Sequence, residues 1–434
     1  MDIHQLYRQK TGSLEAALNL IHSGDRICMA GDCNEAQIFA QNLHTIAPRV
    51  ENVKVLHGRN GHYDFISGDN MAGHFRATGF FYGPDWHIGH PKGNTEYVPS
   101  DLPDYAASAT GIEPFNVFVA GVTPMDENGD FYVSLCVMYE IDLFRSILQQ
   151  PDHRVILEVN PNEVKVSGAL KINIRDVDCL YEVDYPLLEI PAMDTTPTED
   201  RIGGMVAELI HDGDTLQLGI GALPDAIAHH LMDKQDLGLH TEMYTSAMGE
   251  MLRRGVITGE RKNYLKGLSI GTFAGGDRAL YETMQDHPTV RVAPGSFCVD
   301  PTVIMRNDNM VSINTILEMD LTGQVNSETI GTRQYSGSGG GFCFAYGAMH
   351  SKGGRGILAF SARSKKGIPK IKATLTPGSA VTIPRNYVDY IVTEYGVARL
   401  RGRSVRERCE LLIALAHPDD RAELRQKARE YFYI

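Results

Sequence analysis

The sequence predicts an α/β protein built from two similar open α/β domains that face each other across a cleft. Three observations support this: the chain length, an alternation of strands with helices, and an internal repeat. The chain has 434 residues, and at roughly 150 residues per domain two or three domains are expected. Short β-branched segments alternate with helical stretches, which is typical of a mostly parallel sheet. Examples of these segments are 116–122, 154–159, 357–361 and 390–392.

The internal repeat begins with the segment LIHSGD at 20–25, which returns as LIHDGD at 209–214. Three further matches follow in the same order, with a growing offset. They pair Asp126–Gly129 with Asp320–Gly323, Ile156–Leu157 with Ile357–Leu358, and Val177–Asp178 with Val388–Asp389. A duplication followed by loop insertions would produce this pattern.

A polar segment with two prolines, Glu189–Asp200, has the composition of a linker between the two copies. It predicts an N-terminal domain at 1–190 and a C-terminal domain at 191–434. The residues Pro197–Asp200 match a helix start at the beginning of the second copy. Helical spacing of leucines over 404–433, interrupted by His417–Asp420, predicts two helices at the C-terminus.

Composition excludes several classes of protein. With 41 basic and 54 acidic residues the formal net charge is −13, which disfavours binding to nucleic acid or to an anionic membrane. No apolar run approaches the roughly 18 residues of a membrane helix, and the polar N-terminus lacks a secretory signal. Seven scattered cysteines without a CxxC motif favour a cytoplasmic protein with reduced, mostly buried thiols. These cysteines are Cys28, Cys33, Cys136, Cys179, Cys298, Cys343 and Cys409.

One block of the chain departs from this acidic balance. The 60 residues of 329–388 contain no Asp or Glu and carry nine basic residues. Such a block indicates either a site for an anionic small molecule or a solvated basic surface. Its cations are Arg333, Lys352, Arg355, Arg363, Lys365, Lys366, Lys370, Lys372 and Arg385.

The first glycine motif is Gly219-Ile-Gly221-Ala222-Leu-Pro224, placed between a strand and a helix. Glycines at this point allow a tight turn, and the start of the helix can face a phosphate. The dinucleotide-binding fingerprint has a third glycine where this chain has Pro224, and the next strand lacks the acid that would bind a ribose. A tight turn approached by some other ligand is therefore the better interpretation.

The second glycine motif, Gly337-Ser-Gly339-Gly340-Gly341, lies inside the acid-free block. Backbone amides of such a loop can surround an oxyanion or a phosphate, and the alternative is a flexible surface loop. The aromatic residues Phe342, Phe344 and Tyr346 follow at a spacing of two, which predicts an ordered strand after the glycines.

The third motif, 237–246, reads as a strand with one carboxylate, Glu242, among apolar residues. Most such glutamates lie on an edge strand or face solvent, but a carboxylate in a dry pocket can act as a covalent nucleophile. Metal binding has little support. The adjacent His229 and His230 point apart on a helix, and His87 and His90 have no partner at ligand spacing.

Several motifs, in order along nearly the whole chain, resemble the acetyl-CoA hydrolase/transferase family, a family I type of CoA-transferase. Within it the chain is similar to 4-hydroxybutyrate and butyrate:acetate CoA-transferases. The motifs are Glu96–Pro99, Thr123–Ser134, Gly219–Ala226, Asp236–Met243, Arg254–Ile257, Ser336–Gly340, Ser351–Gly354, Thr393–Ala398 and Ala416–Pro418.

The resemblance implies two tandem CoA-transferase α/β domains, coenzyme A or acyl-CoA as cosubstrate with no permanently bound cofactor, and Glu242 as the nucleophilic glutamate. Together with the basic block, it places CoA on the C-terminal domain. The residues expected to bind it are Gly219, Gly221, Ala222, Pro224, Gly337, Gly339, Gly340, Gly341 and Lys365. The family's glycine motif reads GxGGQxD, so its Gln and Asp are replaced here by Gly341 and Cys343, and Tyr346 stands at a basic position.

The expected function is transfer of CoA from an acyl-CoA to a short-chain carboxylate, such as 4-hydroxybutyrate or butyrate, through a glutamyl-CoA thioester. The departures at Gly341 and Cys343 keep open a dicarboxylate acceptor such as succinate or itaconate. Hydrolysis of acyl-CoA and a non-catalytic CoA-binding module also remain alternatives. The expected partners are acyl-CoA and small carboxylic acids, with no nucleic acid and no membrane, in a possible homo-oligomer.

Overall fold

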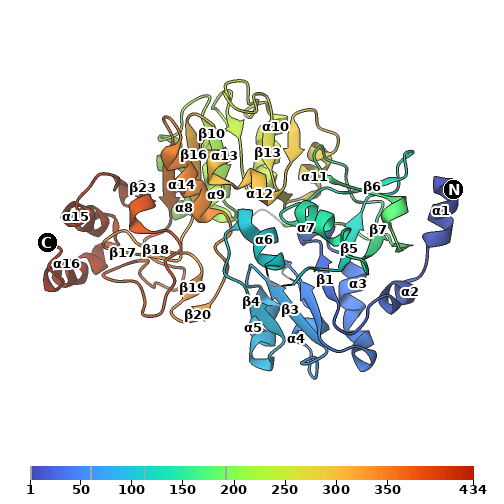
Figure 1. The fold of residues 1–434 in the computed structure, drawn as a ribbon. Coiled ribbons are helices and arrows are strands. Elements are labelled where there is room, and N and C mark those ends of the chain that lie inside the picture. Colours follow the sequence, from blue (N-terminus) through green and yellow to red (C-terminus); the bar gives the residue numbers. More distant parts are fainter. Residues whose placement is uncertain (1, 59–60, 112, 191–192) are drawn as a thin grey trace. The chain divides into compact units, whose positions relative to one another are not determined.

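The computed structural model describes residues 2–58, 61–111, 113–190 and 193–434 (Figure 1). The chain folds as two compact units. Unit 1 comprises Met1–Ile190 and Gly271–Phe297, and unit 2 comprises Pro191–Ile270 and Cys298–Ile434. Each unit is an α/β fold around a mostly parallel sheet, as the sequence predicts.

Unit 1 is organised around a seven-stranded sheet with the strand order β4-β3-β2-β1-β5-β7-β9. All neighbours in it are parallel. The six residues of β5 are all buried, as expected of a central parallel strand covered on both faces. The strands are β1 (Arg26–Met29), β2 (Val53–Leu56), β3 (Phe75–Gly79), β4 (Thr95–Tyr97), β5 (Val117–Val122), β7 (Arg154–Val159) and β9 (Cys179–Glu182).

Short helices cover this sheet, and a separate antiparallel pair, β6 (Asp130–Val133) with β8 (Leu170–Asn173), completes the main elements of unit 1. The helices are α1 (Ile3–Lys10), α2 (Leu14–Asn19), α3 (Gln37–Asn42), α4 (Asp64–Ser67), α5 (Pro84–Gly89), α6 (Tyr105–Thr110), α7 (Glu140–Ile147) and α11 (Arg278–Met284). Short 3-10 turns are η1 (Asp32–Asn34), η2 (Leu43–Arg49), η3 (His90–Lys92), η4 (Leu102–Asp104) and η5 (Ile174–Asp176).

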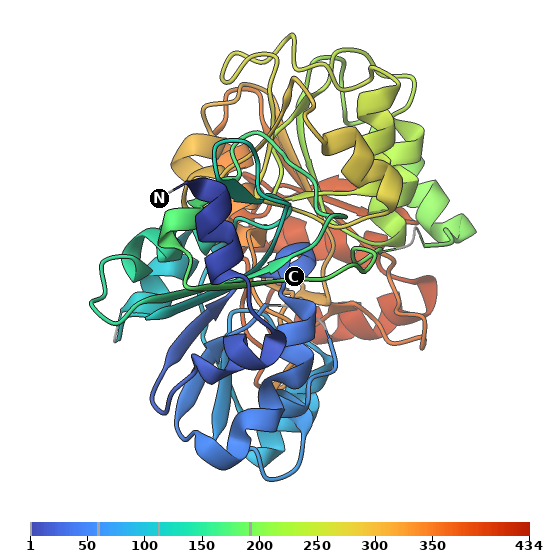
Figure 2. The same ribbon diagram turned by 90° about the vertical axis from the view of Figure 1, so that its right-hand side faces the viewer.

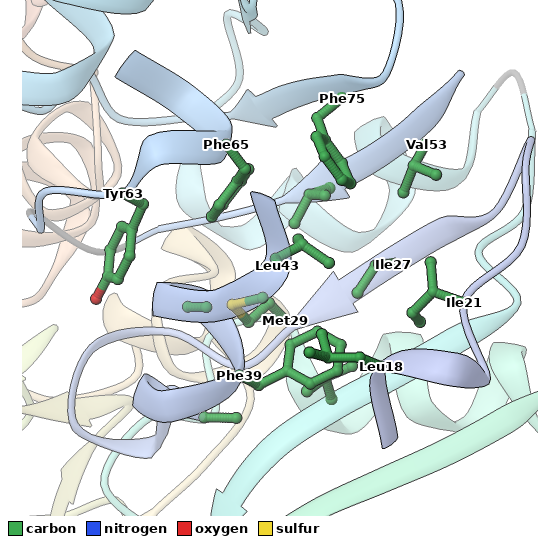
Figure 3. Packing of buried hydrophobic residues seen from close by; sticks show 14 of the residues in the cluster. Leu18, Ile21, Ile27, Met29, Phe39, Leu43, Val53, Tyr63, Phe65 and Phe75 are labelled. Atoms are coloured by element: carbon green, nitrogen blue, oxygen red, sulfur yellow. The ribbon is translucent and has the colours of Figure 1, made fainter. Parts of the chain in front are cut away.

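One hydrophobic cluster of unit 1 lies on one face of β1, β2 and β3. Ile27, Val53 and Phe75 project from these strands toward Leu18 of α2 and Phe39 of α3 (Figure 3). Because side chains alternate between the two faces of a strand, the residues next to them in sequence point to the opposite face.

Unit 2 contains a six-stranded sheet with the order β11-β10-β16-β21-β23-β24. Its strands are parallel apart from the antiparallel edge strand β24. The strands are β10 (Thr215–Leu218), β11 (Gly238–Leu239), β16 (Met310–Asn314), β21 (Arg355–Ala359), β23 (Tyr390–Thr393) and β24 (Gly396–Arg399). A small three-stranded sheet and a hairpin accompany it, formed by β17 (Glu318–Asp320), β18 (Val325–Asn326), β22 (Ile371–Lys372), β19 (Thr329–Ile330) and β20 (Arg333–Gln334).

The first helix of unit 2 begins where the sequence predicts. Thr196 and Glu199 form a reciprocal capping box around Pro197, an arrangement that stabilises a helix by about 1 kcal/mol. The two predicted C-terminal helices are confirmed, and the turn η7 (Pro418–Asp420) separates them. The helices of unit 2 are α8 (Pro197–Ala207), α9 (Ala222–His230), α10 (Ser246–Arg253), α13 (Pro301–Ile304), α14 (Gly341–His350), α15 (Val405–Leu415) and α16 (Arg421–Glu430), with the 3-10 turn η6 (Arg385–Tyr387).

The remaining short elements of the described residues are four strands and one helical turn. They are β12 (Met243–Tyr244), β13 (Ser269–Gly271), β14 (Phe273–Ala274), β15 (Val290–Val292) and α12 (Gly295–Cys298). Figure 2 gives a second view of the same ribbon, with the chain coloured along its length.

The predicted internal repeat is confirmed by the topology of the two units. The order β2-β1-β5-β7-β9 in unit 1 corresponds to β11-β10-β16-β21-β23 in unit 2. The repeated Asp of the first motif has the same role in both copies, because Asp25 pairs with Arg154 at the start of β7 and Asp214 pairs with Arg355 at the start of β21.

The second repeated motif also folds identically in the two copies. Asp126 accepts backbone hydrogen bonds from residues 128 and 130 at 2.9 and 3.0 Å. Asp320 accepts them from residues 322 and 324 at 2.9 and 3.0 Å. The glycines of these turns, Gly129 and Gly323, have φ of 83° and 98°, which explains why glycine recurs there.

The units differ from the expected domains in one segment. Gly271–Phe297 belongs to unit 1, whereas the prediction assigned all of 191–434 to the second domain. Hydrogen bonds within unit 1 hold this segment: Tyr281 Oη donates to the Leu188 carbonyl at 2.7 Å, and Gly295 N donates to the Met138 carbonyl at 2.9 Å. The chain returns to unit 1 about 80 residues after the linker, and no local pattern in the sequence marks this return. Pro191 and Ala192 of the predicted linker lie outside the described residues.

All seven cysteines are buried, as predicted. Within the described ranges, every helix is too short or too polar to cross a lipid bilayer.

Candidate active site

The carboxyl edge of the unit 2 sheet brings three motifs of the sequence to one side. The Gly219–Gly221 turn follows β10, and Glu242 follows β11. The loop of the second glycine motif leads into α14, which crosses over between the parallel strands β16 and β21. The connections from β10 and from β16 run in opposite directions along the sheet. Such a reversal is where open α/β sheets bind ligands.

Glu242 is held by the second glycine motif. The Gly340 N–H donates a hydrogen bond of 2.9 Å to Glu242 Oε2, and the side chain of Glu242 is only partly exposed. Burial raises the pKa of Glu242 to about 7, and the Gly340 N–H opposes this rise. Desolvation disfavours the charged form, while a donor to the carboxylate favours it. The carboxylate is thus poised to ionise near neutral pH.

Steric constraints explain the glycines beside this carboxylate. A Cβ on Gly340 would lie 2.5 Å from Glu242 Oε2 and 2.6 Å from Val299 Cγ1. A Cβ on Gly339 would lie 3.3 Å from Glu242 Oε1, and its φ of +54° is a backbone conformation that favours glycine. Only glycine lets the backbone approach Glu242 this closely.

A buried imidazole supports the segment that carries Glu242. His240 is fully buried and lies between the Cys298 carbonyl, 2.7 Å from Nε2, and the Asn307 amide nitrogen, 3.3 Å from Nδ1. A carbonyl can only accept, so Nε2 carries the proton and Nδ1 accepts from Asn307. Burial lowers the pKa of His240 to about 4, so the ring is neutral. It connects the Glu242 segment to Cys298, and the next residue, Val299, lies beside Gly340.

Lys262 lies close behind the same segment. Its Nζ donates to the carbonyls of Leu239 and Leu268 at 3.1 and 2.7 Å, and burial lowers the pKa of Lys262 to about 8. The backbone of the segment is held as well, since His240 N donates to Leu216 O and Thr241 N donates to Ile270 O. Sequence reasoning missed His240, Lys262 and Asn307; the only signal was the position of His240 two residues before Glu242.

The first glycine motif forms a tight turn, as predicted. Gly219 N donates to the Ile313 carbonyl at 3.0 Å, and Gly221 has φ of +111° immediately before α9. Ala222 and Pro224 are buried in the first turn of this helix. Gln217 and Asn314, at the ends of β10 and β16, exchange two hydrogen bonds of 3.1 Å.

The prediction of a strand after the second glycine motif is wrong, because residues 341–350 form the helix α14. The aromatic side chains also fit a helical period, because Phe342 contacts Tyr346 and Tyr346 stacks on His350, each four residues apart. Cys343 is buried. A Cβ on Gly341 would meet no atom within 4 Å, so the position of the family's Gln is open space.

The acid-free block is partly neutralised by acids from elsewhere in unit 2. Four of its nine cations form ion pairs, namely Lys352 with Asp308, Arg355 with Asp214, Arg363 with Asp419 and Asp420, and Lys372 with Glu318. The other five pair with no carboxylate among the residues that the structure describes. Lys365 is exposed, in a turn closed by the hydrogen bond from Gly367 N to Ser364 O.

The histidines that the sequence disfavoured as metal ligands contact other residues. His230 lies 2.9 Å from Asp200, and His87 and His90 both contact the ring of Tyr82. No group of three potential metal ligands occurs in the described part of the chain.

Comparison with known proteins gives a consistent family. The N-terminal domain of acetyl-CoA hydrolase/transferase matches residues 1–189, and its C-terminal domain matches residues 276–428. A succinyl-CoA:cyclohexane-1-carboxylate CoA transferase of Geobacter metallireducens is 37% identical over 98% of this chain and 96% of its own length. The 4-hydroxybutyrate coenzyme A transferase of Clostridium kluyveri is 35% identical over 100% of both chains.

The crystal structure of RipA from Yersinia pestis covers 100% of both chains with a TM-score of 0.93 and 35% identity. The two domain matches span most of the sequence, and the relatives match along their whole length. This chain is a CoA-transferase that belongs to the acetyl-CoA hydrolase/transferase family.

Proposed function

We propose that the protein transfers CoA from an acyl-CoA to a short-chain carboxylate, such as butyrate or 4-hydroxybutyrate, with Glu242 as covalent nucleophile. The observation that carries this proposal is the carboxylate of Glu242, held 2.9 Å from the Gly340 N–H, at a position where a side chain on Gly340 would collide with it. A relative named for 4-hydroxybutyrate supports the choice of acid.

The reaction follows from a carboxylate next to a thioester. Glu242 attacks the thioester carbonyl, the C–S bond breaks, and an acyl-glutamyl anhydride and CoA thiolate form. The thiolate attacks the glutamyl carbonyl, which releases the first acid and leaves a glutamyl-CoA thioester. The second acid then takes over the CoA by the reverse sequence. Such covalent catalysis divides one difficult step into easier ones.

The loop of the second glycine motif is proposed to stabilise the oxyanions of these steps through its backbone N–H groups. We place CoA along Gly219, Gly221, Ala222 and Pro224, together with Gly337, Gly339, Gly340 and Gly341, and we assign Lys365 to its phosphates. The exposure of Lys365 and its lack of an acidic partner within the described residues support this assignment.

A second candidate, a bulkier or doubly charged acceptor acid, is supported by one observation. The position of the family's Gln is Gly341, around which the structure has open space. A relative is named for the bulky cyclohexane-1-carboxylate and for succinyl-CoA. Hydrolysis would use the same residues and differ only in admitting water to the glutamyl thioester.

Replacing Glu242 tests the nucleophile. Glu242→Ala should abolish transfer, and Glu242→Asp, which retracts the carboxylate by one methylene, should lower kcat by about 100-fold or more because the attacking atom is misplaced. Borohydride reduction after incubation with acyl-CoA should modify Glu242 in each protein that keeps this residue and should leave Glu242→Ala unmodified. Glu250→Gln, which removes an exposed-face carboxylate paired with Arg253 and Arg254 on α10, is the matched control. Substantial transfer by the alanine variant would remove Glu242 from the mechanism.

Gly340→Ala tests the close approach of the loop. Its Cβ would overlap the space of Glu242 Oε2 and Val299, so the carboxylate or the loop must shift, and kcat should fall by about 100-fold with the fold intact. Gly204→Ala on α8, where a Cβ meets nothing closer than 3.7 Å, is the control. Equal kcat values for the two variants would show that the Gly340 contact is not needed.

The pKa of Glu242 predicts a pH dependence of turnover. Only the carboxylate form attacks, so kcat/KM should fall about tenfold per pH unit below pH about 7. The free energy of unfolding should change with pH in the opposite direction to kcat/KM. A carboxyl group whose pKa is raised on folding binds its proton more tightly in the folded state, so stability falls as pH rises from about 4.5 to about 7. The melting temperature of Glu242→Gln should therefore exceed that of the wild type at pH 8 and match it at pH 4. A difference that does not vary with pH would contradict this assignment.

A panel of acids tests the acceptor. We expect kcat/KM values for butyrate and 4-hydroxybutyrate above those for succinate and itaconate, measured with acetyl-CoA as donor. A preference of about tenfold corresponds to about 1.4 kcal/mol. The reverse order would show that the acceptor acid is a dicarboxylate. Gly341→Gln should fill the open space and lower kcat/KM for cyclohexane-1-carboxylate more than for acetate. CoA release without any acceptor measures hydrolysis.

A further inference from the structure

A hollow opens at the amino edge of the unit 1 sheet, where β1, β2 and β3 begin. Its volume is about 200 Å³. Gly24, Asn52 and Gly73, which come shortly before the three strands, line it. The other lining residues are Arg26, Val53, Lys54, Phe75, Arg76 and Glu113.

Three of the lining residues form a row of cations. Arg26 is the register partner of Lys54, and Lys54 is the register partner of Arg76. Register partners on parallel strands point to the same face, at a spacing of about 4.8 Å. The row therefore projects from the face opposite the hydrophobic cluster to which Ile27, Val53 and Phe75 belong (Figure 3).

Two carboxylates offset this row only in part. Glu96 lies 3.2 Å from Lys54 and 2.9 Å from Arg76, and Glu113 lies 2.6 Å from Arg26. Three positive charges thus face two negative ones, and Glu96 is shared between two cations. Like charges on neighbouring strands repel one another, and the row holds one more cation than the carboxylates paired with it.

The second copy of the fold shows that the row is not a requirement of the architecture. The partners equivalent to Arg26 and Lys54 in unit 2 are Thr215 and Gly238. The space beside them is filled by the chain itself, since a Cβ on Gly238 would lie 2.6 Å from Lys262 Cγ. In unit 2 the strand residues at this position are thus uncharged and the side chain of Lys262 lies against Gly238, whereas in unit 1 the position is hollow and the strand residues are cationic.

We propose that Arg26, Lys54 and Arg76 form a binding site for a small polyanion, such as a diphosphate or a polycarboxylate. Guanidinium groups bind phosphate and carboxylate oxygens through paired N–H donors. A row of three cations with a spacing of about 4.8 Å fits a ligand that carries two or more anionic groups. The site lies at the amino edge of unit 1 and is independent of the reaction proposed for Glu242.

Inorganic pyrophosphate and tricarballylate are the two probes, and the readout is the melting temperature in magnesium-free buffer of low ionic strength. We expect a saturable rise of about 2–5 °C that persists in the presence of saturating CoA, because CoA would occupy unit 2. Saturation by pyrophosphate alone identifies a phosphate ligand, and saturation by tricarballylate alone identifies a polycarboxylate. A rise no larger than that with potassium chloride of equal ionic strength overturns the proposal.

Variants locate the site. Arg76→Gln and Lys54→Gln should each raise the half-saturating probe concentration by about tenfold or more, while acyl-CoA turnover of Arg76→Gln stays at the wild-type value. Arg278→Gln removes one positive charge from an exposed ion pair with Glu282 in unit 1 and should leave half-saturation unchanged. The proposal fails if Arg76→Gln and Arg278→Gln saturate at the same concentration.

Discussion

The contact between Glu242 and the Gly340 N–H is the constraint on which the unit 2 site depends. A carboxylate that leaves water loses hydrogen bonds, and a backbone donor at 2.9 Å replaces one of them. The donor can come this close only because Gly339 and Gly340 carry no side chain. The glycines are therefore explained by the neighbouring carboxylate and not by a need for loop flexibility. Val299 Cγ1 also borders this space, so a side chain at Gly340 would meet both it and Glu242 Oε2.

The duplication produced two copies of one topology with different chemistry at the helix that follows the central strand. In unit 1 the first residue of α7 is Glu140, whose buried carboxylate accepts from the N–H groups of Gly31 and Tyr139, each at 2.9 Å. In unit 2 the corresponding helix begins at Gly341, which has open space around it. Unit 1 fills the start of this helix with its own carboxylate, whereas unit 2 leaves it open beside Glu242.

Sequence reasoning reached the features with a local or repeated signature. The helix start at Pro197–Asp200, the repeated segments 126–129 and 320–323, and the duplication itself were all visible as short patterns. It failed at α14, because a glycine run followed by aromatic residues fits two periods equally well. It could not reveal that Gly340 contacts Glu242, since 98 residues separate them. Nor could it align Arg26, Lys54 and Arg76, because the register of parallel strands is set by tertiary packing.

The buried groups behind Glu242 favour one range of pH. Burial lowers the pKa of His240 to about 4 and that of Lys262 to about 8, and it raises the pKa of Glu242 to about 7. Between pH about 7 and about 8 the imidazole is neutral, the ammonium keeps its proton, and the carboxylate is ionised. A neutral His240 can donate to Cys298 and accept from Asn307 at once, whereas a protonated ring could only donate. A charged Lys262 has three N–H donors, and the Leu239 and Leu268 carbonyls accept from two of them. The protonation states that hold the Glu242 segment in place are thus the ones that coexist with an ionised nucleophile.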